Sequence, residues 1–171
     1  MSPAPLLIVD GYNVIFATPQ YRTIAEDDLD AARAALVSDV AAYAHGEWRA
    51  TVVFDAANNP AADGAAHEVA GITVVFSHFG TDADTVIERL ARTARDAGEA
   101  TCVVTSDAAT QWAVLGGSVA RMPSGEFADE LARGGREWEE HSPAGRRKVR
   151  LEDRVDARTR EELWRWARGL E

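Results

Sequence analysis

Aspartates follow four short apolar runs of this sequence, and their positions suggest a shared site. Asp10 comes directly after LLIV, Asp55 after TVVF and Asp107 after TCVVTS. Asp82 and Asp84 lie a few residues beyond ITVVF. Grouped carboxylates repel one another and are costly to hold together without a cation. Because Mg²⁺ and Mn²⁺ prefer oxygen ligands, the aspartates predict a divalent-metal site suited to phosphodiester chemistry.

The apolar runs must be the elements that position these carboxylates. Each run is short and rich in β-branched residues, which is typical of a parallel strand buried on both faces. Helical patterns between the runs indicate right-handed β-α-β crossovers. In such sheets the functional crevice lies outside the carboxyl ends of the strands, so the aspartates should meet at one edge. We expect an α/β fold: one domain with a mostly parallel, twisted sheet flanked by helices.

The element boundaries follow from local signals. Thr23 and Glu26 have capping-box spacing, so a helix is expected to begin there after a loop from Gly11 to Tyr21. This helix is expected to end near Tyr43. The expected strands are residues 6–10, 50–54, 72–76, 101–105 and the SVARM stretch. The other expected helices are residues 82–97, Asp107 to Leu115 and Ser124 to Arg133. Residues 1–133 are expected to form the catalytic domain. Residues 134–171 are expected to form a basic arm and a C-terminal helix that docks on the same domain.

Each aspartate also has an ordinary structural explanation. The DGYN stretch at Asp10 contains common turn residues, and an aspartate after a strand, such as Asp55, can cap a turn or a helix. If Thr81 caps a helix, Asp84 is the acid of its capping box and Asp82 favours the positive end of the helix dipole. Side chains two residues apart on a helix diverge, so only one of these two aspartates is expected on the metal.

The last strand end offers the same two explanations, because Ser106 or Asp107 could simply cap the following helix. The repetition of one placement at four strand ends favours the metal site over four separate coincidences. Beside Asp10, the amide of Asn13 can hydrogen-bond the carboxylate or a metal-bound water.

Composition sets the class of protein. The 171 residues are 46% hydrophobic, enough for one domain with a sizeable core. No stretch approaches the roughly 20 apolar residues that cross a bilayer, and the N-terminus does not resemble a signal peptide. A single cysteine, Cys102, suits a reducing compartment, so we expect a cytoplasmic protein without membrane association. The net charge of −10 argues against a non-specific nucleic-acid binder but does not exclude a nuclease.

Other catalytic patterns are missing from the sequence. It contains no dinucleotide fingerprint, P-loop, nucleophile elbow, or CxxC or HExxH metal motif. Basic residues gather in the last third, where they form either a solvated surface or a patch that contacts phosphates. They are Arg133, Arg136, Arg146, Arg147, Lys148 and Arg150.

Four stretches, taken together, resemble a known family. They are LLIVDGYNVI, VVFDA, TDADTVIERL and VVTSDAATQWAVLG. Over almost its whole length the chain resembles the YacP-like NYN-domain proteins, bacterial members of the PIN-like ribonuclease superfamily. The resemblance implies a PIN-like fold, Mg²⁺ or Mn²⁺, and endoribonuclease activity in mRNA decay, with RNA and the ribosome as partners.

The resemblance also implies roles for individual residues. Asp10, Asp84 and Asp107 match the acids of the strand-one, A-D-x-x-I-E and T-S-D motifs, and are expected to be catalytic and to bind metal. Asp55 would be a further ligand or support the others. The expected orienting groups around the carboxylates are Asn13, Thr105, Ser106 and Asp82. The basic cluster would contact RNA or the ribosome.

Two alternatives belong to other functional classes. One is a non-catalytic RNA- or ribosome-binding module with the same fold, although every expected acid is present. The other is a metal-dependent phosphohydrolase of small substrates, although Gly11 and Tyr12 stand where an Asp-x-Asp nucleophile motif would continue from Asp10.

Overall fold

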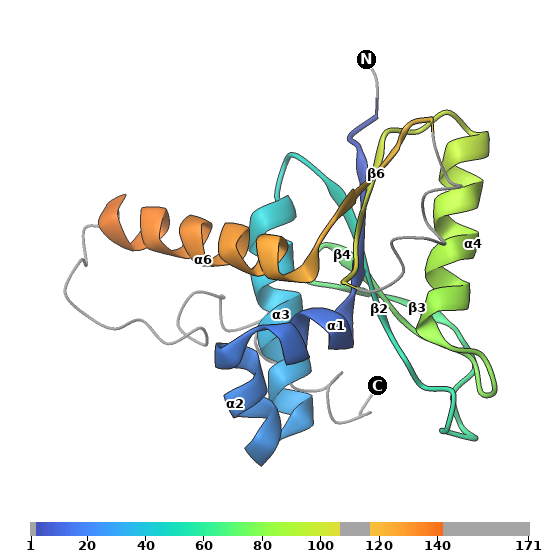
Figure 1. Ribbon diagram of the computed structural model, residues 1–171, viewed down its shortest axis with the longest axis horizontal. Helices are drawn as coiled ribbons and strands as arrows, with labels where there is room; N and C mark the ends of the chain where they lie inside the picture. Colours follow the sequence, from blue (N-terminus) through green and yellow to red (C-terminus); the bar gives the residue numbers. More distant parts are fainter. Residues whose placement is uncertain (1–2, 107–116, 142–171) are drawn as a thin grey trace.

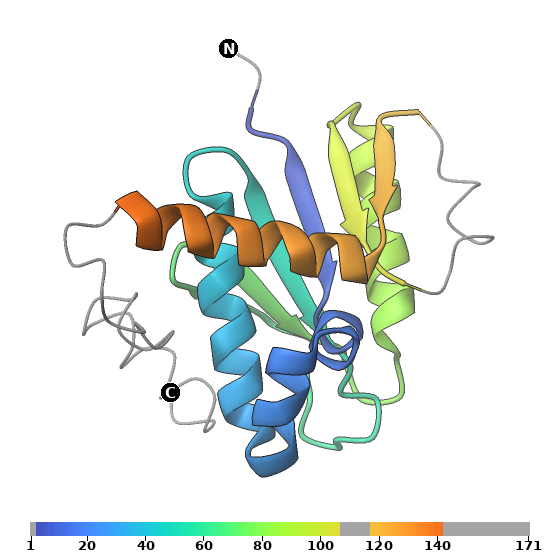
Figure 2. The ribbon, with the colours of Figure 1, turned by 60° about the vertical axis from the view of Figure 1, so that its left-hand side comes forward.

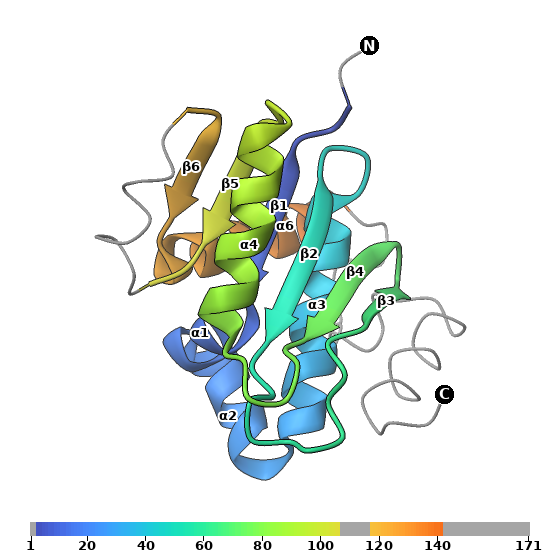
Figure 3. The same ribbon diagram turned by 90° about the vertical axis from the view of Figure 1, so that its right-hand side faces the viewer.

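Six strands form one sheet in the order β3-β4-β2-β1-β5-β6 (Figure 3). A computed structural model of the chain describes residues 3–106 and 117–141, with side chains described through residue 134. All neighbouring strands are parallel except β3 and β4, which are antiparallel. The strands are β1 (Leu6–Asp10), β2 (Arg49–Phe54), β3 (Ala66–Val69), β4 (Ile72–Phe76), β5 (Thr101–Val104) and β6 (Val119–Met122).

Helices cover both faces of the sheet (Figures 1 and 2). One face carries α1, α2, α3 and α6, and the other carries α4. In Figure 2, α6 runs across the strands rather than along them. The helices are α1 (Gly11–Ala17), α2 (Pro19–Asp27), α3 (Leu29–Ala44), α4 (Ala83–Asp96) and α6 (Ser124–His141).

The four central strands, β4, β2, β1 and β5, are largely buried on both faces, as their continuous apolar runs predicted. In β1, Leu7 and Val9 pack into the core beneath α3 and α6, whereas Ile8 packs beneath α4. All three side chains are 1% exposed or less. This two-sided burial confirms the predicted α/β fold with a mostly parallel sheet.

The predicted start of the first long helix was wrong. Residues 11–21, expected to be a loop, form α1 and the start of α2, because Asp10 caps α1 and Pro19 opens α2. Thr23 lies inside α2, where its hydroxyl donates to the Pro19 carbonyl at 3.0 Å. The long helix α3 begins after Asp28, whose carboxylate accepts a hydrogen bond from the Ala31 amide at 3.1 Å.

Two further helix boundaries and one strand differ from the prediction. The cap of α4 is Asp82, not Thr81. The last described helix continues past Arg133 to His141, so the two glycines that follow Arg133 do not end it. The antiparallel strand β3 was missed, because AHEV lacks a long apolar run and pairs along only one edge.

Several predicted features lie outside the described residues. They are the helix from Asp107 to Leu115, most of the basic arm and the C-terminal docking helix. Within the described ranges, no helix has the length and apolar character needed to span a membrane.

Candidate active site

The carboxyl ends of the central strands meet at one edge of the sheet, where α1 begins (Figure 3). Asp10 is the last residue of β1, and Asp55 follows the last residue of β2. Asp84 lies in the first turn of α4, and Ser106 lies two residues beyond the end of β5. The structure therefore brings together residues that are far apart in the sequence, as parallel topology requires.

Asp10 is the most buried carboxylate at this edge, with only 5% of its surface exposed. Its Oδ1 accepts a hydrogen bond from the Asn13 backbone amide at 3.3 Å, and its Oδ2 accepts one from Asn13 Nδ2 at 2.9 Å. The same side chain caps α1, so the motif builds the helix and the carboxylate site together.

The electrostatic surroundings of Asp10 disfavour its charged form. Burial raises the pKa of Asp10 from an ordinary 3.8 to about 6, although the two hydrogen bonds from Asn13 lower it. The negative charges of Asp84 and Asp55 make smaller contributions to this rise. This effect shows that the three carboxylates are close enough to interact, which is the arrangement that a cation would relieve.

A hydrogen-bonded chain joins Asp10 to the T-S-D motif. The Ser106 hydroxyl donates to Asn13 Oδ1, so Asn13 bridges Ser106 and Asp10. Thr105, beside Ser106, is buried, and its backbone amide donates to the Met122 carbonyl at 3.1 Å. Asp107 itself lies outside the described residues.

Asp55 joins the loop that follows β2 to the start of α4. Its Oδ1 accepts a hydrogen bond from the Ala57 amide at 3.0 Å, and its Oδ2 accepts one from the Ala83 amide at 3.1 Å. Ala83 is the first residue of α4, so Asp55 fixes the start of the helix that carries Asp84. These bonds favour a supporting role for Asp55 over that of a direct ligand.

The two aspartates at the start of α4 have different surroundings. Asp82 Oδ1 accepts hydrogen bonds from the Thr85 amide at 2.8 Å and from the Thr85 hydroxyl at 2.6 Å. These bonds lower the pKa of Asp82. Asp84 is exposed, and its charge acts on Asp10. Helix capping therefore accounts for the position of Asp82, whereas the charge of Asp84 acts on the buried carboxylate of Asp10.

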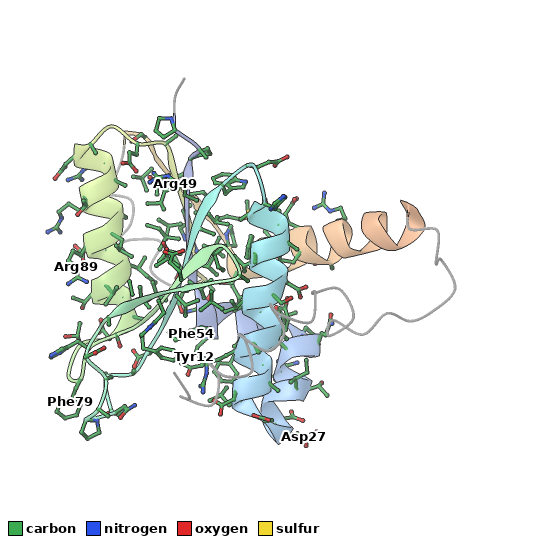
Figure 4. The ribbon with its side chains drawn as sticks, turned by 180° about the vertical axis from the view of Figure 1, so that it is seen from behind. Tyr12, Asp27, Arg49, Phe54, Phe79 and Arg89 are labelled. Atoms are coloured by element: carbon green, nitrogen blue, oxygen red, sulfur yellow. The ribbon has the colours of Figure 1, made fainter. Side chains whose placement is uncertain are left out.

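Aromatic rings support the edge from beneath, a feature that the sequence motifs alone did not reveal. The Tyr12 and Phe54 rings lie with centroids 5.2 Å apart (Figure 4), and Phe54 stacks on Phe76 at 5.4 Å. Arg33 lies over the Phe76 ring at 5.6 Å, and its Nη1 donates to the Tyr12 hydroxyl at 2.8 Å. Tyr12 belongs to the DGYN motif, so its position beside Asp10 was the available signal.

Of the predicted basic residues, Arg133 alone has a described side chain. It is exposed on α6, where its guanidinium pairs with Glu130 at 2.7 Å. Arg136 lies within α6 but beyond the described side chains. The others, namely Arg146, Arg147, Lys148 and Arg150, lie outside the described residues.

Comparison with known proteins identifies the family. The model of the YacP-like NYN domain matches residues 7–168. This chain belongs to the YacP-like NYN family. It is 32% identical over 136 residues to the uncharacterized protein YacP of Bacillus subtilis (strain 168), covering 74% of each chain. Its domain is thus of the PIN-like nuclease type.

Solved structures of the family have the same fold. The crystal structure of a mutant of Rae1 (YacP) from Bacillus subtilis matches with a TM-score of 0.66 and 28% identity, over 93% of this chain and 97% of that chain. A second Rae1 (YacP) crystal structure matches with a TM-score of 0.64 and the same identity, over 96% of this chain and 95% of that chain.

NYN domains of this type generally use a divalent metal, and the site offers suitable donors. Carboxylate oxygens are hard ligands for Mg²⁺ or Mn²⁺, and the mutual charge effect on Asp10 is what a cation would offset. Within the described residues, which include Asp10, Asp55 and Asp84, no group of three or more carboxylate, imidazole or thiol side chains could hold a metal ion. Asp10 and Asp84 supply two of the three acids expected to hold the ion, and Asp107 is the third.

Proposed function

We propose that this NYN-family chain is a divalent-metal-dependent endoribonuclease that hydrolyses RNA phosphodiester bonds. The observation that carries the proposal is the buried Asp10 carboxylate, whose pKa is raised partly by the charges of Asp84 and Asp55 at the carboxyl edge of the sheet. Perturbed carboxylates that converge on one strand edge are typical of functional sites.

In this proposal some residues bind the metal ion and others orient the carboxylates that bind it. Asp10, Asp84 and Asp107 would hold Mg²⁺ or Mn²⁺, which when bound would lower the pKa of a water molecule and offset charge on the scissile phosphate. Asn13 fixes both oxygens of Asp10, and Ser106 fixes Asn13. Asp55 sets the position of α4 and therefore that of Asp84.

We further propose that the substrate is mRNA in the cytoplasm, including mRNA on the ribosome. Cys102 is buried in β5 and burial raises its pKa, which suits an inert thiol in a reducing compartment. The acidic net charge of −10 disfavours tight binding to free RNA, so presentation by a larger particle would help the chain meet its substrate.

The test is cleavage of end-labelled RNA with Mg²⁺ or Mn²⁺, with and without translating ribosomes. We expect internal cuts with the wild type and a loss of at least about 100-fold in rate for Asp10→Asn and Asp84→Asn. The matched control is Asp27→Asn, which removes one exposed carboxylate at the end of α2 (Figure 4) and should cleave normally.

Two outcomes would contradict the proposal. Cleavage by Asp10→Asn at the wild-type rate would remove Asp10 from the catalytic site. A wild type that binds RNA or ribosomes but never cleaves would instead identify a non-catalytic binding module with this fold.

A further inference from the structure

An exposed arginine lies at the edge of the acidic site, in a position that no sequence motif indicated. Arg121 is on β6, the edge strand next to β5. Its Nη2 donates a hydrogen bond to the backbone carbonyl of Ser106 at 3.0 Å. The Ser106 hydroxyl donates to Asn13 Oδ1, and Asn13 Nδ2 donates to Asp10 Oδ2. Hydrogen bonds through Ser106 and Asn13 therefore link the guanidinium to the buried carboxylate.

The sheet register sets the side of the edge on which Arg121 lies. Arg121 is paired with Val103 of β5, and Val103 packs in the core beneath α4. Neighbouring residues of a parallel pair project to the same face, so Arg121 leaves the sheet on the α4 side. Asp84 is on the first turn of that same helix. A ligand at this face would therefore meet the carboxylates and the guanidinium together.

The contacts of Arg121 leave it available for an anion. Five other arginines form ion pairs with a carboxylate, namely Arg33, Arg49, Arg92, Arg95 and Arg133. No described carboxylate forms an ion pair with Arg121, whose side chain is exposed. A guanidinium has five N–H donors, and the bond to Ser106 uses one of them.

These observations identify the chemistry that the arginine suits. A guanidinium fixed by one carbonyl can present a planar pair of N–H groups to two phosphate oxygens. An RNA strand approaching Asp10, Asp55 and Asp84 is repelled by their charge, and one fixed cation at the rim would offset part of that repulsion. We propose that Arg121 binds a phosphate group of the RNA strand and so positions the strand over the carboxylates. This inference rests on the proposed ribonuclease function.

The experiment measures RNA binding separately from cleavage. Fluorescence anisotropy of a short labelled single-stranded RNA, in EDTA and over a range of salt concentrations, gives Kd and its salt dependence for each variant. For Arg121→Gln we expect binding about tenfold weaker and a salt slope smaller by about 0.7, the value for one lost phosphate contact on a single strand. In cleavage assays KM should rise while kcat stays within about twofold of the wild type.

The matched control is Arg89→Gln. Arg89 is an exposed arginine on α4 (Figure 4), and its loss changes the net charge by the same amount. Its Kd and salt slope should match those of the wild type. Arg121→Lys keeps the charge but loses the planar fork, so it should restore the salt slope and only part of the affinity.

Each outcome of these measurements either supports or overturns the proposed role of Arg121 in binding a phosphate group. Equal Kd and slope for Arg121→Gln and Arg89→Gln would reduce Arg121 to a cap on the Ser106 carbonyl, as would a folded Arg121→Lys that fails to restore the slope. Absence of RNA binding by the wild type would also overturn the inference. If the wild type binds RNA through Arg121 but does not cleave it, the inference stands and the ribonuclease proposal fails.

Discussion

Asp10 combines a structural role with an energetic cost. It caps α1, yet its burial and its acidic neighbours raise its pKa to about 6. The folded protein therefore keeps a proton on Asp10 between about pH 4 and 6, where the unfolded chain has released it. The resulting contribution to the free energy of unfolding is fully present below about pH 4, and is lost as pH rises through about 6.

Asp10→Asn should remove this pH dependence in metal-free protein. Between about pH 5 and pH 8, the free energy of unfolding of the wild type should fall by about 1.4 kcal/mol relative to that of the variant. Urea denaturation of both proteins in EDTA measures the difference at each pH. A difference that is the same at both values would show that Asp10 ionises normally in the folded protein.

The sequence predicted which residues meet at the site better than it predicted their contacts. The sequence was enough to predict the meeting of Asp10, Asp55 and Asp84, because the carboxyl ends of parallel strands lie at the same edge of a sheet. The bond from Ala83 to Asp55 and the bond from Arg121 to Ser106 could not be foreseen. They depend on loop paths and on the register of strands far apart in the chain, which a single sequence does not encode locally.

At the scale of elements, Gly11 joins β1 to α1 against the buried Phe54 ring. A Cβ at residue 11 would lie 2.3 Å from Phe54 Cε1 and 2.5 Å from Cδ1. The ring is fully buried and packs against Tyr12 and Phe76, so it has little room to move. Because the backbone at residue 11 lies so close to the Phe54 ring, the connection requires a residue without a side chain.

Gly11→Ala should lower the free energy of unfolding by about 1–3 kcal/mol, because the methyl group displaces a packed ring. It should also slow cleavage, because the displaced backbone carries Asp10 and Asn13. The control is Gly125→Ala on α6, where an added Cβ meets nothing within 4 Å. That variant should be neutral or more stable by up to about 1 kcal/mol. Equal urea midpoints for the two variants would contradict the close contact.

Long apolar runs made the central strands predictable, whereas helix starts were not. The stretch after Asp10 looked like a loop because its Gly, Asn and Pro residues are common in turns. In the structure Asp10 caps α1 and Pro19 occupies the first turn of α2, so the same residues begin helices. Asp28 and Asp82, not the nearby threonines, cap α3 and α4. The residue that caps a helix is the one whose side chain reaches a free backbone amide of the first turn. Tertiary packing determines which side chain is placed to do so.

At the scale of the whole molecule, the net charge of −10 and the acidic edge act together. A divalent ion at the edge would relieve the local repulsion at Asp10 and reduce the overall charge. Any salt screens the overall charge, but only an ion bound at the edge competes with the proton on Asp10. These two effects can be separated because they depend differently on pH.

Mn²⁺ should therefore raise the unfolding temperature of the wild type more at about pH 8 than at about pH 5. With a pKa of about 6, roughly a tenth of the Asp10 side chains are ionised at about pH 5, so apparent Mn²⁺ affinity should be about tenfold weaker there. Differential scanning fluorimetry against NaCl of equal ionic strength measures the specific shift. Asp10→Asn should lose most of that shift at both pH values, while Asp27→Asn should keep it. An equal shift in Asp10→Asn and the wild type would place the Mn²⁺ elsewhere on this acidic chain and leave the buried carboxylate without a cation to hold.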